Sequence, residues 1–183
     1  ELSSEVVGAQ LGQDALKGSL IAGIIGLAIV CVFMCWVYLL PGLASSLALI
    51  LYTELILILL NAFDITLTLP GIAGIILGIG MAVDANVIVF ARVREEIATG
   101  KSVQTSMKIG FQKAMSAILD GNITTLIASV VLMALGSGTV KGFAYTLMIG
   151  IILSLFTAMV VTRYILYSLY ACLLYTSDAA DDL

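Results

Sequence analysis

The chain has 183 residues, of which 61% are hydrophobic and 11% are charged, and its formal net charge is −4. Soluble domains are about 45–50% apolar and about 25% charged, so the composition excludes a water-soluble globular protein. Three acidic residues fall within the last six positions. Without them, eight basic residues face nine acidic ones, and no charge signal for nucleic acid or acidic substrates remains.

The chain begins with a polar stretch that precedes the apolar sequence. This stretch lacks the basic-then-apolar arrangement of a signal peptide. We interpret residues 1–18 as the end of a truncated extracytoplasmic domain.

Five apolar segments follow and make up a membrane domain over residues 19–171. A helix of about twenty residues crosses the roughly 30 Å of hydrocarbon in a bilayer, and lipid offers the backbone no hydrogen-bond partners, so each segment must be helical. The sequence therefore predicts an all-α integral membrane protein with five transmembrane helices. Their expected positions are about 19–40, 43–62, 68–90, 116–135 and 142–170.

One connection, residues 91–115, is long and basic. It carries five of the eight basic residues, namely Arg92, Arg94, Lys101, Lys108 and Lys113. Because Lys and Arg concentrate on the cytoplasmic side, we place this loop and the C-terminus in the cytoplasm and the N-terminus outside. The loop is also amphipathic enough to lie at the membrane surface, although a solvated connector is the plainer interpretation.

The C-terminal stretch has an unusual sequence. CLLYTSDAAD, at residues 172–181, resembles the translation of a common sequencing-library adapter. We interpret residues 172–183 as a non-native read-through tail.

The third segment holds an aspartate, Asp84, inside the predicted membrane region. A charged side chain at such a depth costs about 2.5–3.5 kcal/mol on insertion scales and usually has a functional reason. We predict that Asp84 is a proton relay; the alternative is that it hydrogen-bonds a neighbouring helix, helped by Asn86. Small residues that permit close helix packing precede it, and we assign this role to Gly71, Gly74, Gly78 and Gly80.

The fourth segment opens with polar residues. Asp120 and Thr124 are four positions apart and share a helix face, with Asn122 and Thr125 close by. We predict that these four and Asn86 form a polar network supporting Asp84, although Asp120 also fits an acid stabilised by the helix dipole at a helix start.

Two further features of the composition bear on chemistry. The sequence has no histidine, so no imidazole can carry protons or bind zinc, and we predict no metal site. Glu54, in the middle of the second segment, is as costly in lipid as Asp84 but has no accompanying motif, and we assign it no role.

Three long stretches resemble one protein family. They are TLTLPGIAGIILGIGMAVDANVIVFARVREEI, GFQKAMSAILDGNITTL and GSGTVKGFAYTLMIGIILSLFTAMVVTR. Together they are similar to the membrane domain of the SecD family, bacterial protein-export proteins related to the proton-driven RND transporters. The resemblance covers about residues 7–169 and implies an RND/SecD-type bundle, of which this chain holds spans two to six.

The resemblance also implies a function. A SecD-type subunit sits in the bacterial inner membrane, pairs with SecF, works beside the SecYEG channel with YajC as a further candidate partner, and uses the proton motive force to assist unfolded polypeptides across. It is a transport component rather than an enzyme, and it needs no cofactor besides the proton gradient.

The resemblance further assigns site residues. The family's relay aspartate falls on Asp84, and its fourth-span motif falls on Asp120, Asn122, Thr124 and Thr125. The chain departs from the family pattern at Ala91, where Glu is common, and at Gly121, where Ala is usual, and these departures leave the ion network at the inner end undefined.

Two other function classes fit parts of the sequence. An RND-type exporter of small molecules would share the bundle and the proton-carrying aspartate. An intramembrane aspartyl protease would pair Asp84 with Asp120, but Asp84 lies four residues beyond Gly80, which is the wrong register for that family's GxGD motif.

Overall fold

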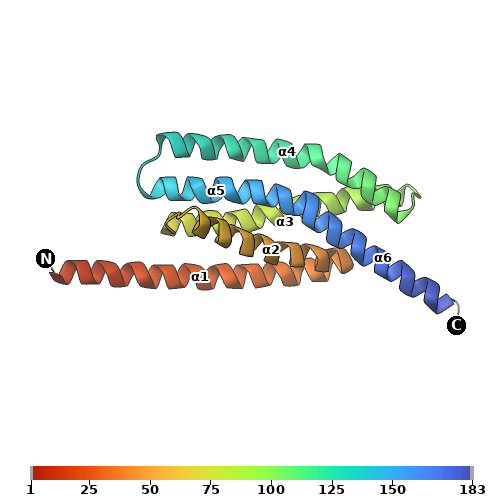
Figure 1. Cartoon of the computed structure of the whole chain (residues 1–183), viewed down its shortest axis with the longest axis horizontal. Helices are drawn as coiled ribbons and strands as arrows, with labels where there is room; N and C mark the ends of the chain where they lie inside the picture. The colour runs from red at the N-terminus through yellow and green to blue at the C-terminus, as the bar shows by residue number, and fades with distance from the viewer. Residues whose placement is uncertain (1, 182–183) are drawn as a thin grey trace.

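The computed structural model describes the backbone of residues 2–181 and the side chains of residues 13–171. Every regular element of this part is helical, and the helices run lengthwise in an elongated bundle (Figure 1). Five of its helical segments are long and apolar enough to cross a membrane. The elements are α1 (Leu2–Tyr38), α2 (Leu40–Ala62), α3 (Leu69–Ala98), α4 (Val103–Leu135), α5 (Thr139–Phe156), the π-helical turn η1 (Thr157–Val161) and α6 (Thr162–Asp181).

The helix starts follow from local sequence. Thr68 precedes α3, and its hydroxyl accepts a hydrogen bond from the backbone N–H of Gly71 at 3.1 Å. Pro70 lies in the first turn of α3, where its missing N–H costs nothing. Ser102 caps α4 in the same way by accepting from the N–H of Thr105 at 3.4 Å. These caps satisfy donors that the helices themselves leave without partners.

Residues 91–115, which we expected to form a loop, are mostly helical. They belong to the last turns of α3 and the first turns of α4, and only residues 99–102 between these helices are irregular. The 30 residues of α3 extend about 45 Å, well beyond a hydrocarbon core of about 30 Å. The two helices therefore continue past the apolar sequence as a charged hairpin.

Helices also reach both limits of the described backbone, Leu2 and Asp181. Residues 2–18, which we interpreted as the end of an outer domain, continue without a break into the first apolar segment as part of α1. The side chains of residues 172–183, where we expect a non-native tail, lie outside the described residues.

The fifth predicted span is a helix with a π turn in it. The N–H of Thr162 donates to the carbonyl oxygen of Thr157, five residues earlier, where an α-helix would use the residue four earlier. The hydroxyl of Thr157 donates back to the carbonyl oxygens of Leu153 and Ser154, at 2.9 and 3.2 Å. The turn joins α5 to α6 without interrupting the helical rod (Figure 1).

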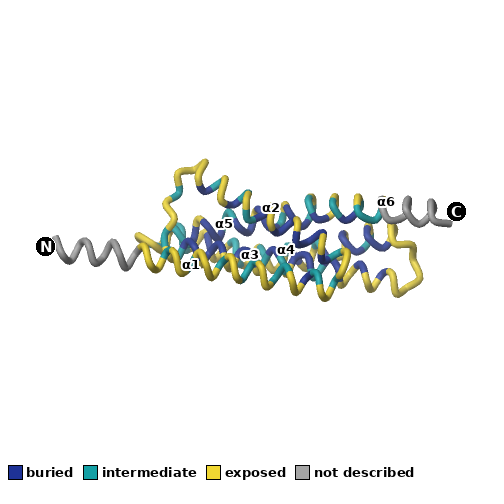
Figure 2. Tube along the Cα trace, turned by 90° about the horizontal axis from the view of Figure 1, so that it is seen from below, coloured by how far each residue is buried: buried dark blue, intermediate teal, exposed yellow. Residues whose placement is uncertain are grey.

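The buried core lies along α2, α3 and α5, whereas α1 and α4 are mostly uncovered (Figure 2). α3 packs most extensively against α5 and next against α4. Gly71 lies near Gly142 and Thr146, and Gly78 lies near Gly150, so α3 and α5 run parallel. α3 is therefore the central helix, against which most of the others pack.

The small residues of α3 do not all take part in this packing. Gly71, Gly74 and Gly78 are buried against α5, and a Cβ at Gly78 would collide with the hydroxyl of Tyr52. Gly80 is exposed, and a Cβ there would meet no atom within 4 Å. The packing role that we expected for Gly80 is not found among the described residues, because two residues beyond Gly78 a helix presents its opposite side.

Candidate functional site

Asp84 lies at a cleft between α3 and α4. The cleft has a volume of about 220 Å³, and Asp84 itself is exposed. Its walls come from one face of each helix, with Met81, Asp84, Ala85 and Ile88 on α3 and Ala117, Ile118, Gly121, Asn122 and Thr125 on α4. The structure thus brings Asp84 together with two of the polar residues predicted to support it, Asn122 and Thr125.

The other three predicted supporting residues do not line the cleft. Asn86 is buried, with 3% of its surface exposed, and its Oδ1 has no hydrogen-bond partner among the described residues. Asp120 and Thr124 are exposed beside the cleft, and the hydroxyl of Thr124 donates to the backbone carbonyl of Asp120 at 2.9 Å. Residues two apart on a helix point in nearly opposite directions, so Asn86 turns away from Asp84, and Asp120 turns away from Asn122.

The polar groups of α4 in the cleft are held by their own helix. The side-chain amide of Asn122 donates to the carbonyl oxygen of Ile118 at 2.7 Å, and the hydroxyl of Thr125 donates to that of Gly121 at 3.3 Å. The ion pairs of the described residues join other side chains and leave Asp84 out. Its carboxylate therefore stands at an open face, with an amide and a hydroxyl nearby.

The α3–α4 hairpin is pinned at the end where the two helices join. Glu96 is buried, and its two carboxylate oxygens accept from the ammonium groups of Lys101 and Lys113. A Cβ at Gly110 would lie 2.8 Å from the backbone nitrogen of Val93, so the helix backbones nearly touch there. From the sequence, Lys101 and Lys113 were expected only to mark the cytoplasmic side, so their ion pairs with Glu96 were not predicted.

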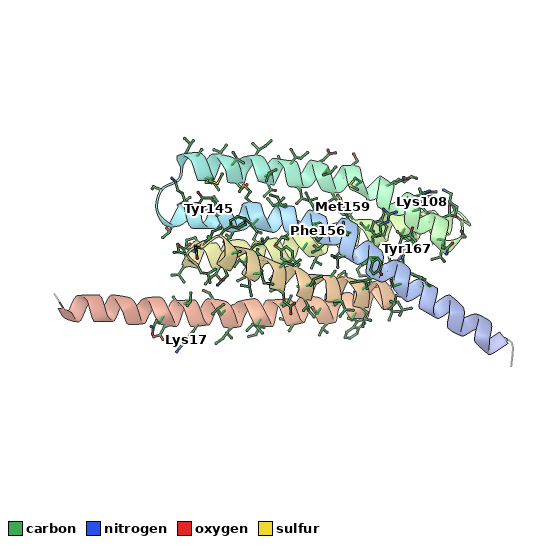
Figure 3. All side chains as sticks on the ribbon, in the orientation of Figure 1. Lys17, Lys108, Tyr145, Phe156, Met159 and Tyr167 are labelled. Atoms are coloured by element: carbon green, nitrogen blue, oxygen red, sulfur yellow. The ribbon has the colours of Figure 1, made fainter. Side chains whose placement is uncertain are left out.

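A larger cavity lies at the opposite end of the bundle. Its volume is about 770 Å³, and it opens between α5 and the link from α2 to α3. Its lining is mainly apolar and includes Tyr145, labelled in Figure 3, together with Asp64 and Lys141. Asp84 does not reach it.

The lining of the cleft includes one carboxylate, that of Asp84. Among the described residues there is no group of three or more His, Cys, Asp or Glu side chains that could hold a metal ion. Aspartyl proteases need two carboxylates at one site, and Asp84 is the one carboxylate in the lining of this cleft.

Comparison with known protein families identifies the family of this chain. Residues 1–171 match the profile of the family described as "Protein export membrane protein SecD/SecF, C-terminal". The chain belongs to the SecD/SecF family. The resemblance that the sequence motifs carried is thereby confirmed.

Curated SecD proteins match most of the chain. The "Protein translocase subunit SecD" of Acidaminococcus fermentans is 51% identical over 168 residues, which are 92% of this chain and 40% of that protein. The SecD subunit of Synechocystis is 51% identical over 165 residues, which are 90% of this chain and 35% of that protein. The chain thus spans less than half the length of these SecD relatives.

Solved SecDF structures share the fold. The crystal structure of SecDF from Thermus thermophilus, described as a translocon-associated membrane protein, superposes with a TM-score of 0.85 at 39% identity. The match covers 87% of this chain and 22% of that one. A second SecDF structure, in its super-membrane-facing form, gives a TM-score of 0.80 at 40% identity. The predicted all-α membrane bundle is confirmed as a SecDF-type membrane domain.

Proposed function

We propose that this chain is membrane-domain sequence of a SecD-type translocase subunit, in which Asp84 relays protons so that the proton motive force assists polypeptide translocation through SecYEG. In this proposal it works in the bacterial inner membrane with SecF, with YajC as a further partner, as a transport component and not as an enzyme. The names of its relatives, protein translocase subunits, support an export role.

The observation that carries the relay role is the position of Asp84 in the α3–α4 cleft. Hydrocarbon opposes the ionised form of a carboxylate by about 2.5–3.5 kcal/mol, whereas water or a polar partner at the open face favours it. Whether Asp84 holds a proton therefore depends on what covers the cleft. A change in cover is thus coupled to uptake or release of a proton.

The energy available matches this role. One elementary charge moved through a potential of 100 mV is worth about 2.3 kcal/mol, and about 1.4 kcal/mol changes an equilibrium tenfold. One proton per cycle can therefore shift a two-state helix bundle by more than tenfold.

Asp84→Asn in the full-length protein tests the relay. The substitution keeps nearly the size and shape of the side chain and removes its titratable proton. We expect proton-gradient stimulation of export to fall at least tenfold while association with SecF stays unchanged. Translocation of a preprotein into inverted membrane vesicles, with and without a protonophore, measures the first effect, and co-purification measures the second.

Asp120→Asn is the matched control, because Asp120 is exposed on the neighbouring helix but does not line the cleft. In Asp120→Asn, proton-gradient stimulation of export should remain within a few-fold of the value for the parent protein. Undiminished stimulation in Asp84→Asn would refute the relay role. An equal loss in both variants would mean that the cleft does not single out Asp84.

A further inference from the structure

The helical rod formed by α5 and α6 changes its packing partners at the π turn η1. Before the turn, α5 packs mainly against α3 and α4, whereas beyond it α6 packs mainly against α2. α6 also runs in a different direction from α5 (Figure 1). Bends in helices commonly occur at π turns, because the extra residue displaces the regular hydrogen bonds. The π turn is therefore the point at which α6 departs from the direction of α5.

The extra residue of the π turn keeps one side of the rod buried. Ser154, Ala158, Thr162 and Leu166 follow one another at steps of four, and each is at most 1% exposed. In a regular α-helix, every step of four turns the side chain by about 40° from its starting direction, so three steps would carry Leu166 about 120° away from Ser154. One additional residue compensates for about 100° of this rotation. The π turn therefore holds α6 in register with the core.

The same turn leaves the hydroxyl of Thr162 without a partner. Thr53, Thr125 and Thr157 each donate to the carbonyl oxygen four residues earlier, as threonines within helices commonly do. For Thr162 that acceptor would be Ala158, but the backbone N–H of Thr162 passes it and donates to Thr157. The Thr162 hydroxyl is fully buried and has no hydrogen-bond partner among the described residues. A polar group buried in this way costs free energy.

α3 brings a second polar group of this kind to the turn. Gly78 lies against Gly150, and two further steps of four along both parallel helices bring Asn86 level with Ala158. The Oδ1 atom of Asn86 is buried and also lacks a hydrogen-bond partner among the described residues. The described helices themselves bury both this acceptor and the hydroxyl donor. A small rearrangement of the turn can therefore form hydrogen bonds that the present arrangement lacks.

We propose that η1 is a hinge with two hydrogen-bond arrangements. In the arrangement described here, the long bond runs from the N–H of Thr162 to the carbonyl oxygen of Thr157. In the other, the extra residue has moved one turn towards α6, and both the N–H and the hydroxyl of Thr162 donate to Ala158. Because the bend moves with the extra residue, α6 changes its direction relative to α5. The hinge does not depend on the proposed proton role of Asp84.

Distances between spin labels in the full-length protein test the hinge. The native cysteines are replaced by alanine, and the protein is reconstituted in lipid nanodiscs. Labels at Val131 of α4 and Tyr164 of α6 span the turn, whereas labels at Val131 and Phe156 of α5 do not, and all three positions are exposed. We expect two distances for the first pair and one for the second. A single distance for the spanning pair, or two distances for both pairs, would overturn the proposal.

Two substitutions distinguish a hinge from a fixed bend. Thr162→Val keeps the shape of the side chain and removes the hydroxyl that only the second arrangement satisfies. We expect the population of that arrangement to fall about fivefold, the usual effect of one hydrogen bond on an equilibrium. Thr157→Val is the matched control, because its hydroxyl bonds to carbonyl oxygens that precede the turn, and it should leave the ratio unchanged. An unchanged ratio in Thr162→Val, or equal changes in both variants, would contradict the hinge.

Deletion of Val160 removes the extra residue itself. Val160 is an exposed residue of the turn, so its loss leaves the core intact. A regular helix one residue shorter still brings Leu166 to within about 20° of the direction of Ser154, and α6 can keep its packing. The spanning pair of labels should then give one distance. Two distances in the deletion variant would show that the extra residue is not what moves.

Discussion

At the scale of single residues, Tyr52 decides how closely three helices approach. Its side chain is fully buried, and its hydroxyl has no hydrogen-bond partner among the described residues. The hydroxyl lies against Gly78 of α3 and Gly150 of α5. The two glycines leave room for a phenol from α2, so the three positions are one packing unit.

Gly78→Ala should destabilise the protein by about 1–3 kcal/mol, the usual cost of an extra methyl group in a filled core. Tyr52→Phe in the same background should recover part of this loss, since it removes the atom that collides. Gly80→Ala is the control: its Cβ meets no neighbour, and alanine favours a helix by up to about 1 kcal/mol. Denaturation in mixed micelles measures all three, and equal losses at both glycines would contradict the packing described.

Residue geometry also explains which parts of the site were predictable. The cost of a carboxylate in lipid pointed to Asp84, and the structure places it with Asn122 and Thr125. The sequence prediction also grouped Asn86, Asp120 and Thr124 with them, but these three do not line the cleft, because neighbours in sequence were treated as neighbours in space. The angle of about 100° between consecutive helical residues would have separated the two faces.

At the scale of elements, the α3–α4 hairpin depends on one buried carboxylate. Glu96 joins the end of α3 to the start of α4 through Lys101 and Lys113. The adjacent Glu95 pairs with Arg92 at 2.8 Å on the exposed side of α3. Two consecutive glutamates thus make one internal clamp and one surface pair.

We predict that Glu96→Gln destabilises the hairpin more than Glu95→Gln does, because it weakens two charge-assisted hydrogen bonds, to Lys101 and Lys113. Glu95→Gln should change stability by less than about 1 kcal/mol, as exposed pairs do. Hydrogen exchange of the amides near residues 97–106 reports local opening of the hairpin. Similar protection in both variants would argue against the clamp.

The elements themselves were predictable to different degrees. Apolar segments of about twenty residues identified the spans, because hydropathy records what lipid demands of a helix. Hydropathy says nothing of a charged helix in water, so the continuation of α3 and α4 through residues 91–115 was not foreseen. The π turn at Thr157–Val161 also went unnoticed, since one extra residue in an apolar run leaves the composition unchanged.

At the scale of the whole molecule, the two ends of the bundle differ in charge. The tip formed by α3 and α4 carries Lys108, which lies at one end of the bundle in Figure 3, together with the clamp lysines. The link between α4 and α5 lies at the other end (Figure 1). Positive charge collects on the cytoplasmic side of membrane proteins, so we expect the tip to face the cytoplasm.

Cysteine labelling tests this orientation. In a full-length protein whose native cysteines are replaced by alanine, Thr99→Cys at the tip should react with a membrane-impermeant maleimide only after the inner membrane is permeabilised. Ser137→Cys, in the link between α4 and α5, should react in intact spheroplasts. The reverse labelling pattern would show that the tip faces the outside of the membrane.

The length of the α3–α4 hairpin has a mechanical consequence. Two helices clasped at Glu96 make a stiff arm about 45 Å long, anchored along most of its length in the same bundle that holds Asp84. Ala98 lies 14 residues, or about 21 Å, beyond Asp84 along α3, so a pivot of about 10° at the depth of Asp84 moves the end of the hairpin by about 4 Å. A small movement of α3 near Asp84 therefore becomes a larger movement at the tip of the α3–α4 hairpin, where other molecules can contact the protein.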